Sequence, residues 1–220
     1  MILIFDTSTS HLAIGLADDS GNMLAEFHAE ALPDERGIHD ARLASETERL
    51  LHKTGAKARE ISRIGLIIGP GSFTGLRIGL SFAKGLSLAT HAGIVALTQH
   101  EVMKATAATH ADYIITPGYR PDLLYFAENE SPRSIQLLRT EEFLKLPEKS
   151  TLAHQFFENA SNVPAVHPCI FVTPSLAVMA NLTAGSLEIL EGDSLETLEP
   201  LYITSEGIGY RVSLRGATKE

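Results

Sequence analysis

A glycine-rich segment at residues 69–79, Gly-Pro-Gly-Ser-Phe-Thr-Gly-Leu-Arg-Ile-Gly, carries the pattern that could most readily bind a ligand. It follows an apolar run and opens a helical pattern, so free backbone N–H groups and the helix dipole meet there and favour an anion. The segment lacks the Gly-Lys-Ser/Thr of a Walker A loop, and its third glycine, Gly75, comes one residue late for the dinucleotide fingerprint. We favour close packing against another backbone, because small residues recur every four positions, at Gly75, Gly79, Ala83 and Ser87. Phosphate binding is the alternative.

A hydroxyl-rich run after the first apolar stretch is the second candidate. Asp6 precedes it, and a carboxylate there could hold a metal–nucleotide through water while the turn cradles phosphate. Equally, Asp6 could be a turn acid that accepts hydrogen bonds from its own backbone. The residues that would bind phosphate in the first case, as a vestigial site, are Asp6, Thr7, Ser8, Thr9, Gly71 and Ser72.

The other reactive residue types predict no catalytic site. No two of the nine histidines have the i, i+4 spacing of a metal pair on a helix. The single cysteine, Cys169, lies among apolar residues and is expected to be buried and inert. Ser72 is not a hydrolase nucleophile, because Pro70 and Thr74 stand where the two glycines of that motif belong.

Apolar runs and turn residues predict the elements that position these groups. Strands are expected at residues 2–5, 11–17 and 23–29, with a hairpin turn at 18–22 in which Gly21 and Asn22 tolerate positive φ. Helices and strands then alternate, which predicts a mixed sheet with helices packed on it; these elements cover residues 38–54, 63–68, 73–90, 94–97 and 98–110.

The second half of the chain has a different texture, with many prolines and short elements. We expect strands at residues 113–116, 123–127 and 134–138, and brief helices at 141–146 and 175–182. The change in pattern places a boundary near residues 99–112, which divides the chain into lobes 1–105 and 106–220.

The predicted helix at residues 73–90 is apolar over most of its circumference. A surface helix of a small domain needs only one apolar stripe, so this helix is either enclosed by the fold or packed against another protein. In the second case its contact residues are Phe73, Leu76, Ile78, Leu80 and Phe82, with Arg77 as a polar anchor.

Composition excludes several classes of protein. The chain has 220 residues, 44% of them hydrophobic, and a net charge of −9, so it has no overall basic surface for gripping a phosphate backbone. One cysteine excludes a disulfide framework and favours a reducing compartment. The start of the sequence is typical of a strand and not of a leader, and no stretch is typical of a membrane span, so we expect a cytoplasmic protein without membrane contact.

Several motifs together resemble one known family. They are Ile4-Phe5-Asp6-Thr7-Ser8-Thr9, His39 opening the first long helix, the segment 69–79, Ala83-Lys84-Gly85-Leu86 and Glu199-Pro200-Leu201-Tyr202-Ile203. This pattern is similar to the TsaB family, also called YeaZ, whose members are often labelled glycoprotease-like. The resemblance covers roughly the first half of the chain. It implies an α/β, actin-like ATPase fold of the sugar kinase and Hsp70 type. Each of its two lobes would have a mixed sheet flanked by helices, the second lobe being reduced.

The resemblance also implies a function in tRNA modification. The chain would be a non-catalytic subunit that binds and activates TsaD, which transfers a threonylcarbamoyl group to an adenosine beside the tRNA anticodon. TsaE, an ATPase, would join them, and tRNA would be met only through the complex. Alone, the chain would form a homodimer. No cofactor is expected, apart from weak ATP or ADP binding at the complex interface. The family's pairing surface adds His39 and Leu43 of the first helix to the residues of the second.

Two departures from family patterns accompany the resemblance. TsaD-like enzymes carry a His-x-x-x-His metal pair on a helix that here holds His100 with Ala96 and Lys104 on either side, so that metal site is absent. Ser45-Glu46-Thr47 replace a proline and two apolar residues in the first helix, which would alter pairing if Glu46 or Thr47 faces the partner. The alternative functions are an ATP-dependent phosphotransferase or ATPase of the same fold and, with no supporting residues, a protease.

Overall fold

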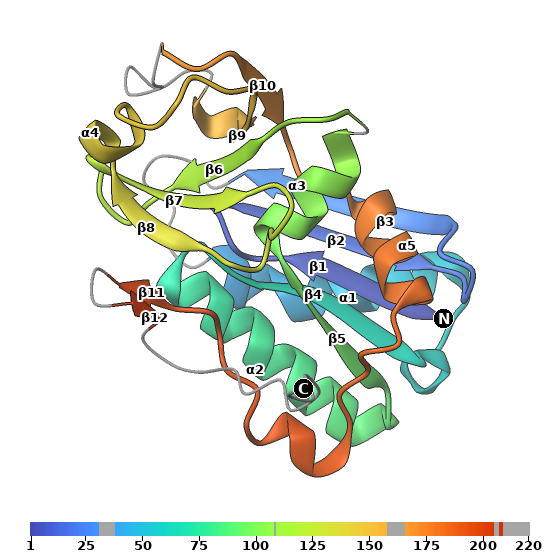
Figure 1. The fold of residues 1–220 in the computed structure, drawn as a ribbon. Coiled ribbons are helices and arrows are strands. Elements are labelled where there is room, and N and C mark those ends of the chain that lie inside the picture. Colours follow the sequence, from blue (N-terminus) through green and yellow to red (C-terminus); the bar gives the residue numbers. More distant parts are fainter. Residues whose placement is uncertain (31–37, 108, 158–165, 205–206, 209–220) are drawn as a thin grey trace, which may run out of the picture.

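The computed structural model describes residues 1–30, 38–107, 109–157, 166–204 and 207–208. Its first sheet has the order β3-β2-β1-β4-β5 (Figure 1). β1 pairs antiparallel with β2 and parallel with β4, so the first strand lies at the centre of the sheet. The strands are β1 (Ile2–Asp6), β2 (His11–Ala17), β3 (Met23–Glu30), β4 (Arg63–Gly69) and β5 (Gly93–Thr98).

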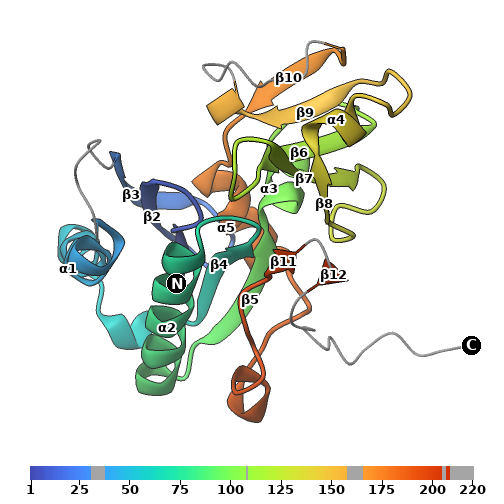
Figure 2. The same ribbon diagram turned by 90° about the vertical axis from the view of Figure 1, so that its left-hand side faces the viewer.

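Helices cover both faces of the first sheet. α1 (Ile38–Thr54) and α2 (Phe73–Thr90) pack side by side on one face, as Figure 2 shows. α5 (Leu176–Gly185) packs on the other. Alternation along β1 explains the two cores: Leu3 and Phe5 join the cluster under α1 and α2, whereas Ile2 and Ile4 join the cluster under α5.

The second sheet repeats this topology. Its order is β10-β9-β6-β7-β8, and again a three-strand antiparallel meander is followed by two parallel strands beside its first strand. Its strands are β6 (Tyr113–Pro117), β7 (Leu123–Glu128), β8 (Gln136–Arg139), β9 (Thr151–His154) and β10 (Cys169–Val172). The predicted fold class is therefore confirmed. The second lobe is the smaller one, since the helix between β8 and β9, α4 (Thr140–Phe143), has four residues.

The two lobes are tied together by α3 and by the end of the chain. α3 (Gln99–Ala107) follows β5 and packs on β6 and β9 of the second sheet. After β10 the chain returns to the first sheet through α5, a bridge between Ile94 and Leu190, and a hydrogen bond from Leu201 N to the Ile68 carbonyl oxygen at 2.7 Å. The division into lobes 1–105 and 106–220 assigns α5 to the second lobe by sequence. In the structure α5 packs on the sheet of the first lobe.

The differences from the expected elements lie mostly in the second half. β9 and β10 were not predicted, α3 ends at Ala107 instead of reaching His110, and the last helix extends to Gly185. Three 3-10 turns (Ala58–Glu60, Gln155–Phe157 and Gly192–Leu195) and a small hairpin of β11 (Ile203–Thr204) and β12 (Gly207–Ile208) complete the described elements. No helix among the described residues is long and apolar enough to span a membrane.

Candidate functional site

The glycine segment packs directly on the hydroxyl-rich turn that follows β1. Ser72 N donates to the Ser8 carbonyl oxygen at 2.6 Å, and Thr7 Oγ1 donates to the Gly75 carbonyl oxygen at 2.8 Å. A Cβ added at Gly71 would clash with the Ser8 carbonyl oxygen, and one at Gly75 would clash with that of Thr7. The prediction of close packing is confirmed: the glycines let α2 begin against the first turn.

The Asp6 side chain forms part of this turn. Its carboxylate accepts a hydrogen bond from Ser8 N at 2.7 Å, as in a turn acid. Burial raises the pKa of Asp6 above its ordinary value, and hydrogen bonds from Ser8 offset part of that effect. The side chain does not line the cavity described next, and neither does that of Thr7.

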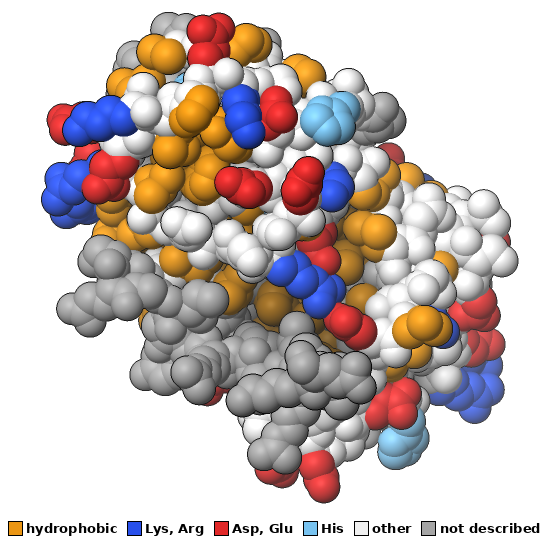
Figure 3. Space-filling model, in the orientation of Figure 1, with side chains coloured by type: hydrophobic (Ala, Val, Ile, Leu, Met, Phe, Trp, Pro, Cys, Tyr) orange, Lys and Arg blue, Asp and Glu red, His pale blue; other side chains and the backbone are white. Residues whose placement is uncertain are grey.

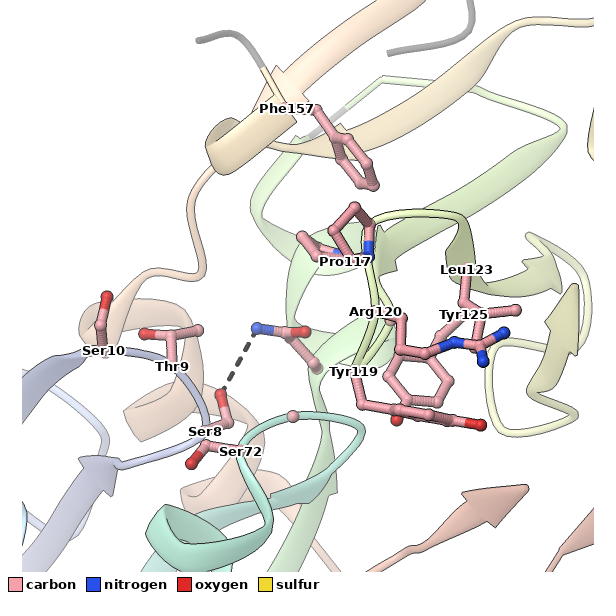
Figure 4. Close-up of a pocket in the computed structure, with 14 residues that line it drawn as sticks. Ser8, Thr9, Ser10, Ser72, Pro117, Tyr119, Arg120, Leu123, Tyr125 and Phe157 are labelled. Carbon is pink, nitrogen blue, oxygen red and sulfur yellow. Dashed lines mark hydrogen bonds between the residues drawn. The ribbon is translucent and has the colours of Figure 1, made fainter. Parts of the chain in front are cut away.

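A cavity of about 510 Å³ lies between the two lobes at this point (Figure 4). The first lobe contributes the turn after β1, the glycine loop and Gln99 at the start of α3. The second contributes the connection between β6 and β7, and Phe157. Of the residues predicted to bind phosphate, the structure brings four to the cavity: Ser8, Thr9, Gly71 and Ser72. Whether they bind phosphate stays a prediction.

Among the residues that the structure describes, no carboxylate lines the cavity. The residues around it are Ser8, Thr9, Ser10, Gly71, Ser72, Gln99, Pro117, Gly118, Tyr119, Arg120, Pro121, Leu123, Tyr125 and Phe157. Arg120 is the charged member, and its guanidinium donates to Asp122 Oδ2 at 3.0 Å. Across the described residues, no group of three His, Cys, Asp or Glu side chains is arranged to hold a metal ion. The described lining offers hydroxyl, amide and aromatic groups to a ligand.

The predicted pairing residues divide between the core and the surface. Leu43 and Leu80 are buried in the core between the helices and the first sheet, and Leu76 is buried as well. Their side chains are covered within this chain, and their part in pairing stays a prediction. Ile78 and Phe82 are half-buried against the same core. His39 is buried, and its Nε2 donates to the His11 carbonyl oxygen at 3.0 Å.

Phe73 and Arg77 form an exposed cluster with Tyr202 at the start of α2. The Phe73 side chain is 54% exposed and stacks on the Tyr202 ring, with 4.6 Å between ring centroids. Arg77 lies 4.1 Å over the Phe73 ring, and its Nε donates to the Tyr202 hydroxyl at 2.8 Å. Sequence reasoning noted the motif around Tyr202 but did not place the residue at the surface of α2. We call Phe73, Arg77 and Tyr202 the α2 cluster.

The polar stretch of α1 does not face outwards as one unit. Ser45 is exposed, but Glu46 is buried and pairs with Arg42 and Arg49 of the same helix at 3.4 and 3.1 Å. Thr47 is buried and donates to the Leu43 carbonyl oxygen at 2.7 Å. Glu46 and Thr47, the two residues that could have disturbed pairing, therefore both have polar partners within α1.

His100 and Cys169 have no catalytic surroundings. His100 is fully buried, with its Nε2 3.2 Å from Thr116 Oγ1, and burial next to His154 lowers its pKa to about 3. At neutral pH the imidazole of His100 is therefore uncharged. Cys169 is half-buried instead of buried, and burial raises the pKa of its thiol, as expected of an unreactive cysteine.

Comparisons with known proteins agree with this geometry. The family model "TsaD: tRNA N6-adenosine threonylcarbamoyltransferase" matches residues 35–124. The chain is similar to two curated proteins, each named "tRNA threonylcarbamoyladenosine biosynthesis protein TsaB". The Escherichia coli protein is 37% identical over 40% of this chain and 35% of its own length. The Bacillus subtilis protein is 31% identical over 53% of this chain and 48% of its own length. The matched stretches thus span less than half of either relative.

A solved structure extends the likeness in fold to most of the chain. The structure "YeaZ from Pseudomonas aeruginosa" has a TM-score of 0.71 and 20% identity, and the match covers 92% of this chain and 99% of that one. At this identity the likeness shows the fold. Taken together, part of this chain is similar in sequence to two TsaB proteins, and most of the chain shares the two-lobed fold of YeaZ.

Proposed function

We propose that this chain is a non-catalytic subunit in the biosynthesis of tRNA threonylcarbamoyladenosine, and that it acts by binding and activating TsaD. The names of the curated relatives support the pathway. The match to the TsaD family model supports TsaD as the partner, because related lobes can pair through equivalent faces. TsaE would join the pair, and tRNA would be bound by the complex as a whole.

The observation that carries the proposal is the α2 cluster. Aromatic and arginine side chains that stay partly exposed on a rigid helix are the residue types most enriched in binding hot spots. Leu88, on the same helix, is 77% exposed. α2 bears Arg77 and Lys84 and no acidic residue, although the chain carries a net charge of −9. The outer face of α2 therefore suits a protein partner with apolar and acidic groups.

Two features support a role without catalysis. His100, on the helix where TsaD-like enzymes would carry a histidine pair, bonds to Thr116 inside the core. Asp6 bonds to Ser8 N and does not reach the cavity. His100 and Asp6 are thus both engaged in contacts within the chain.

The test is light scattering after size exclusion, with the chain alone and mixed with TsaD of the same organism. We expect a one-to-one complex, and a loss of affinity of at least about tenfold in Phe73→Ala and Arg77→Glu, as for hot-spot residues. Leu187→Ala is the matched control, since Leu187 is 99% exposed and outside the α2 cluster. Unchanged affinity in both α2 variants would refute pairing through this face, and a persistent homodimer with no TsaD complex would refute the proposed function.

A further inference from the structure

The outer strands of the two five-stranded sheets are β3, β5, β8 and β10, and all but β10 are protected against a further strand. An unprotected outer strand exposes N–H and C=O groups that can pair with another chain. β3 carries the exposed polar side chains Glu26, His28 and Glu30. The bridge between Ile94 and Leu190 covers β5, and the hairpin of β11 and β12 lies against β8. Among the described residues, β10 has neither a charged side chain nor a pairing strand on its outer side.

The hydrogen bonds of β10 show which of its backbone groups face outwards. Thr151 N, at the start of β9, donates to the Pro168 carbonyl oxygen at 2.9 Å. In a strand the N–H and C=O groups of one residue point to the same side, and successive residues alternate. Every second residue counted from Pro168 therefore faces β9. The outward groups are those of Cys169, Phe171 and, directly after β10, Thr173, and they are free to pair with another strand.

The side chains around β10 are apolar and uncharged. Ile170 and Phe171 are each 39% exposed. The stretch 159–187 contains no Asp, Glu, Lys or Arg, and its described part, 166–187, includes both β10 and α5. The whole chain has a net charge of −9, so two copies repel each other over most of their surface. An uncharged face is where two copies can meet without that repulsion.

We propose that β10 pairs antiparallel with β10 of a second copy, around a two-fold axis at Phe171, so that the second sheets of both copies form one continuous sheet. In this register Phe171 lies opposite its equivalent, and Cys169 lies opposite Thr173 of the second copy. Pro168 and Pro174, which have no N–H to donate, limit the pairing to the residues between them. A second copy repeats the same spacing of donors and acceptors, so every outward group finds a partner. Aromatic side chains opposite each other add to the stability of such a pair.

Size exclusion with light scattering of the whole chain alone, under reducing conditions, is the first test. We expect a particle of twice 23.8 kDa that dissociates on dilution, with a Kd on the order of 10–100 µM, because two short strands bury little surface. Arg77→Glu should leave this dimer unchanged, since Figure 1 shows β10 at the top of the molecule and α2 near the bottom. The proposal therefore does not depend on the proposed function. A monomer at every concentration, or a dimer that Arg77→Glu alone dissociates, would overturn it.

Two charge changes at Phe171 test the position of the axis. Phe171→Glu and Phe171→Lys each place like charges opposite one another, so each should weaken the dimer at least tenfold. A mixture of the two variants should form dimers again, because opposite charges then face each other across the axis. Leu24→Glu is the matched control: Leu24 is 51% exposed on β3, and this variant should dimerise like the parent. A single variant as tightly paired as the parent, or a mixture that stays monomeric, would refute the assignment.

A cysteine pair tests the register. Thr173 is exposed, and in the proposed pair it lies about 5.5 Å, between Cα atoms, from Cys169 of the second copy. Thr173→Cys should therefore form a covalent dimer with oxidised glutathione. Within one chain the two positions are about 13 Å apart along the strand, too far for a disulfide. Thr173→Cys combined with Cys169→Ser is the control and should form none. Covalent dimers in equal yield with and without Cys169 would rule out this register.

Discussion

The two sheets share one strand order but achieve it by different means. The first has strands of five to eight residues and helices on both faces. The second has strands of four to six residues and a single turn of helix, α4, between β8 and β9. Hydrophobic side chains reach the surface of the second lobe, among them Tyr119, Leu144, Ile170 and Phe171, and Figure 3 shows hydrophobic side chains on this part of the molecule. Strand pairing carries the topology, and helical cover can be reduced without losing it.

The same contrast appears at the cavity between them. The wall from the first lobe depends on backbone contacts that only glycine permits, between Gly71 and Ser8 and between Gly75 and Thr7. The wall from the second lobe depends on side chains such as Tyr119 and Tyr125. Substitutions in the first wall should therefore change the stability of the fold. Substitutions in the second wall should change ligand binding.

The largest expected effect comes from breaking the backbone contact of the first lobe. A Cβ at Gly75 would meet the carbonyl oxygen of Thr7, which cannot move without disturbing β1. Gly75→Ala should lower the free energy of unfolding in urea by about 3 kcal/mol. Gly85, in the same helix, has open space at the Cβ position, so Gly85→Ala should raise it by about 0.5–1 kcal/mol. Equal effects of the two substitutions would show that close packing does not fix this wall.

A pH-dependent effect of intermediate size is expected from two buried histidines, His100 of α3 and His154 of β9. Burial lowers the pKa of His100 to about 3 and that of His154 to about 4, from an ordinary 6.5. The unfolded chain takes up these protons below pH 6.5 while the folded chain does not, so stability is present above pH 6.5 and is lost as pH falls. Between pH 7.5 and 5 the loss should be roughly 2 kcal/mol for each histidine.

Urea unfolding of a His100→Leu variant at both pH values isolates that contribution. The variant should lose roughly 2 kcal/mol less than the parent chain between pH 7.5 and 5, even if the loss of the bond to Thr116 lowers its stability at both. His52→Gln, which changes an exposed histidine of α1, should keep the parent's pH dependence. A His100→Leu variant as sensitive to acid as the parent would contradict the assignment.

The smallest effect is expected at the surface link between the lobes. Arg133, between β7 and β8, pairs with Glu101 of α3 and with Glu188 beyond α5, the latter at 2.8 Å. Arg133→Met should cost less than about 1 kcal/mol, because exposed ion pairs contribute little, and the cost should vanish in 1 M salt. Arg139→Met, whose partner Asp122 lies in the same lobe, serves as control. A large cost that salt leaves unchanged would mean that packing of the Arg133 stem joins the lobes.

The sequence predicted the first lobe well because each of its elements carries its own signal. Residues 11–17, 38–54 and 73–90 have the observed bounds of β2, α1 and α2, since long periodic segments bounded by turn residues are locally determined. β9 and β10 have four residues each and were missed, because so short a strand shows no clear alternation. Pairing with β6 and with each other defines them.

For a similar reason, the sequence predicted only the wall of the candidate site that the first lobe contributes. Glycines and hydroxyls at a strand end form a motif, and Ser8, Thr9, Gly71 and Ser72 do meet at the cavity. The prolines and tyrosines of the opposite wall form no such motif. The sequence therefore did not identify residues 117–125 as part of the site. The interface prediction included Leu76 and Leu80 because an apolar helix surface does not reveal which side faces the sheet.

The return of α5 to the first sheet has a consequence for synthesis. Ile2, Ile4 and Ile67 are covered by Leu176, Met179 and Ala180, which leave the ribosome long after the strands they cover. The lobe that is made first is therefore completed last. During translation its uncovered face would be a site for chaperones, and an isolated fragment that stops before residue 176 would expose that face to aggregation.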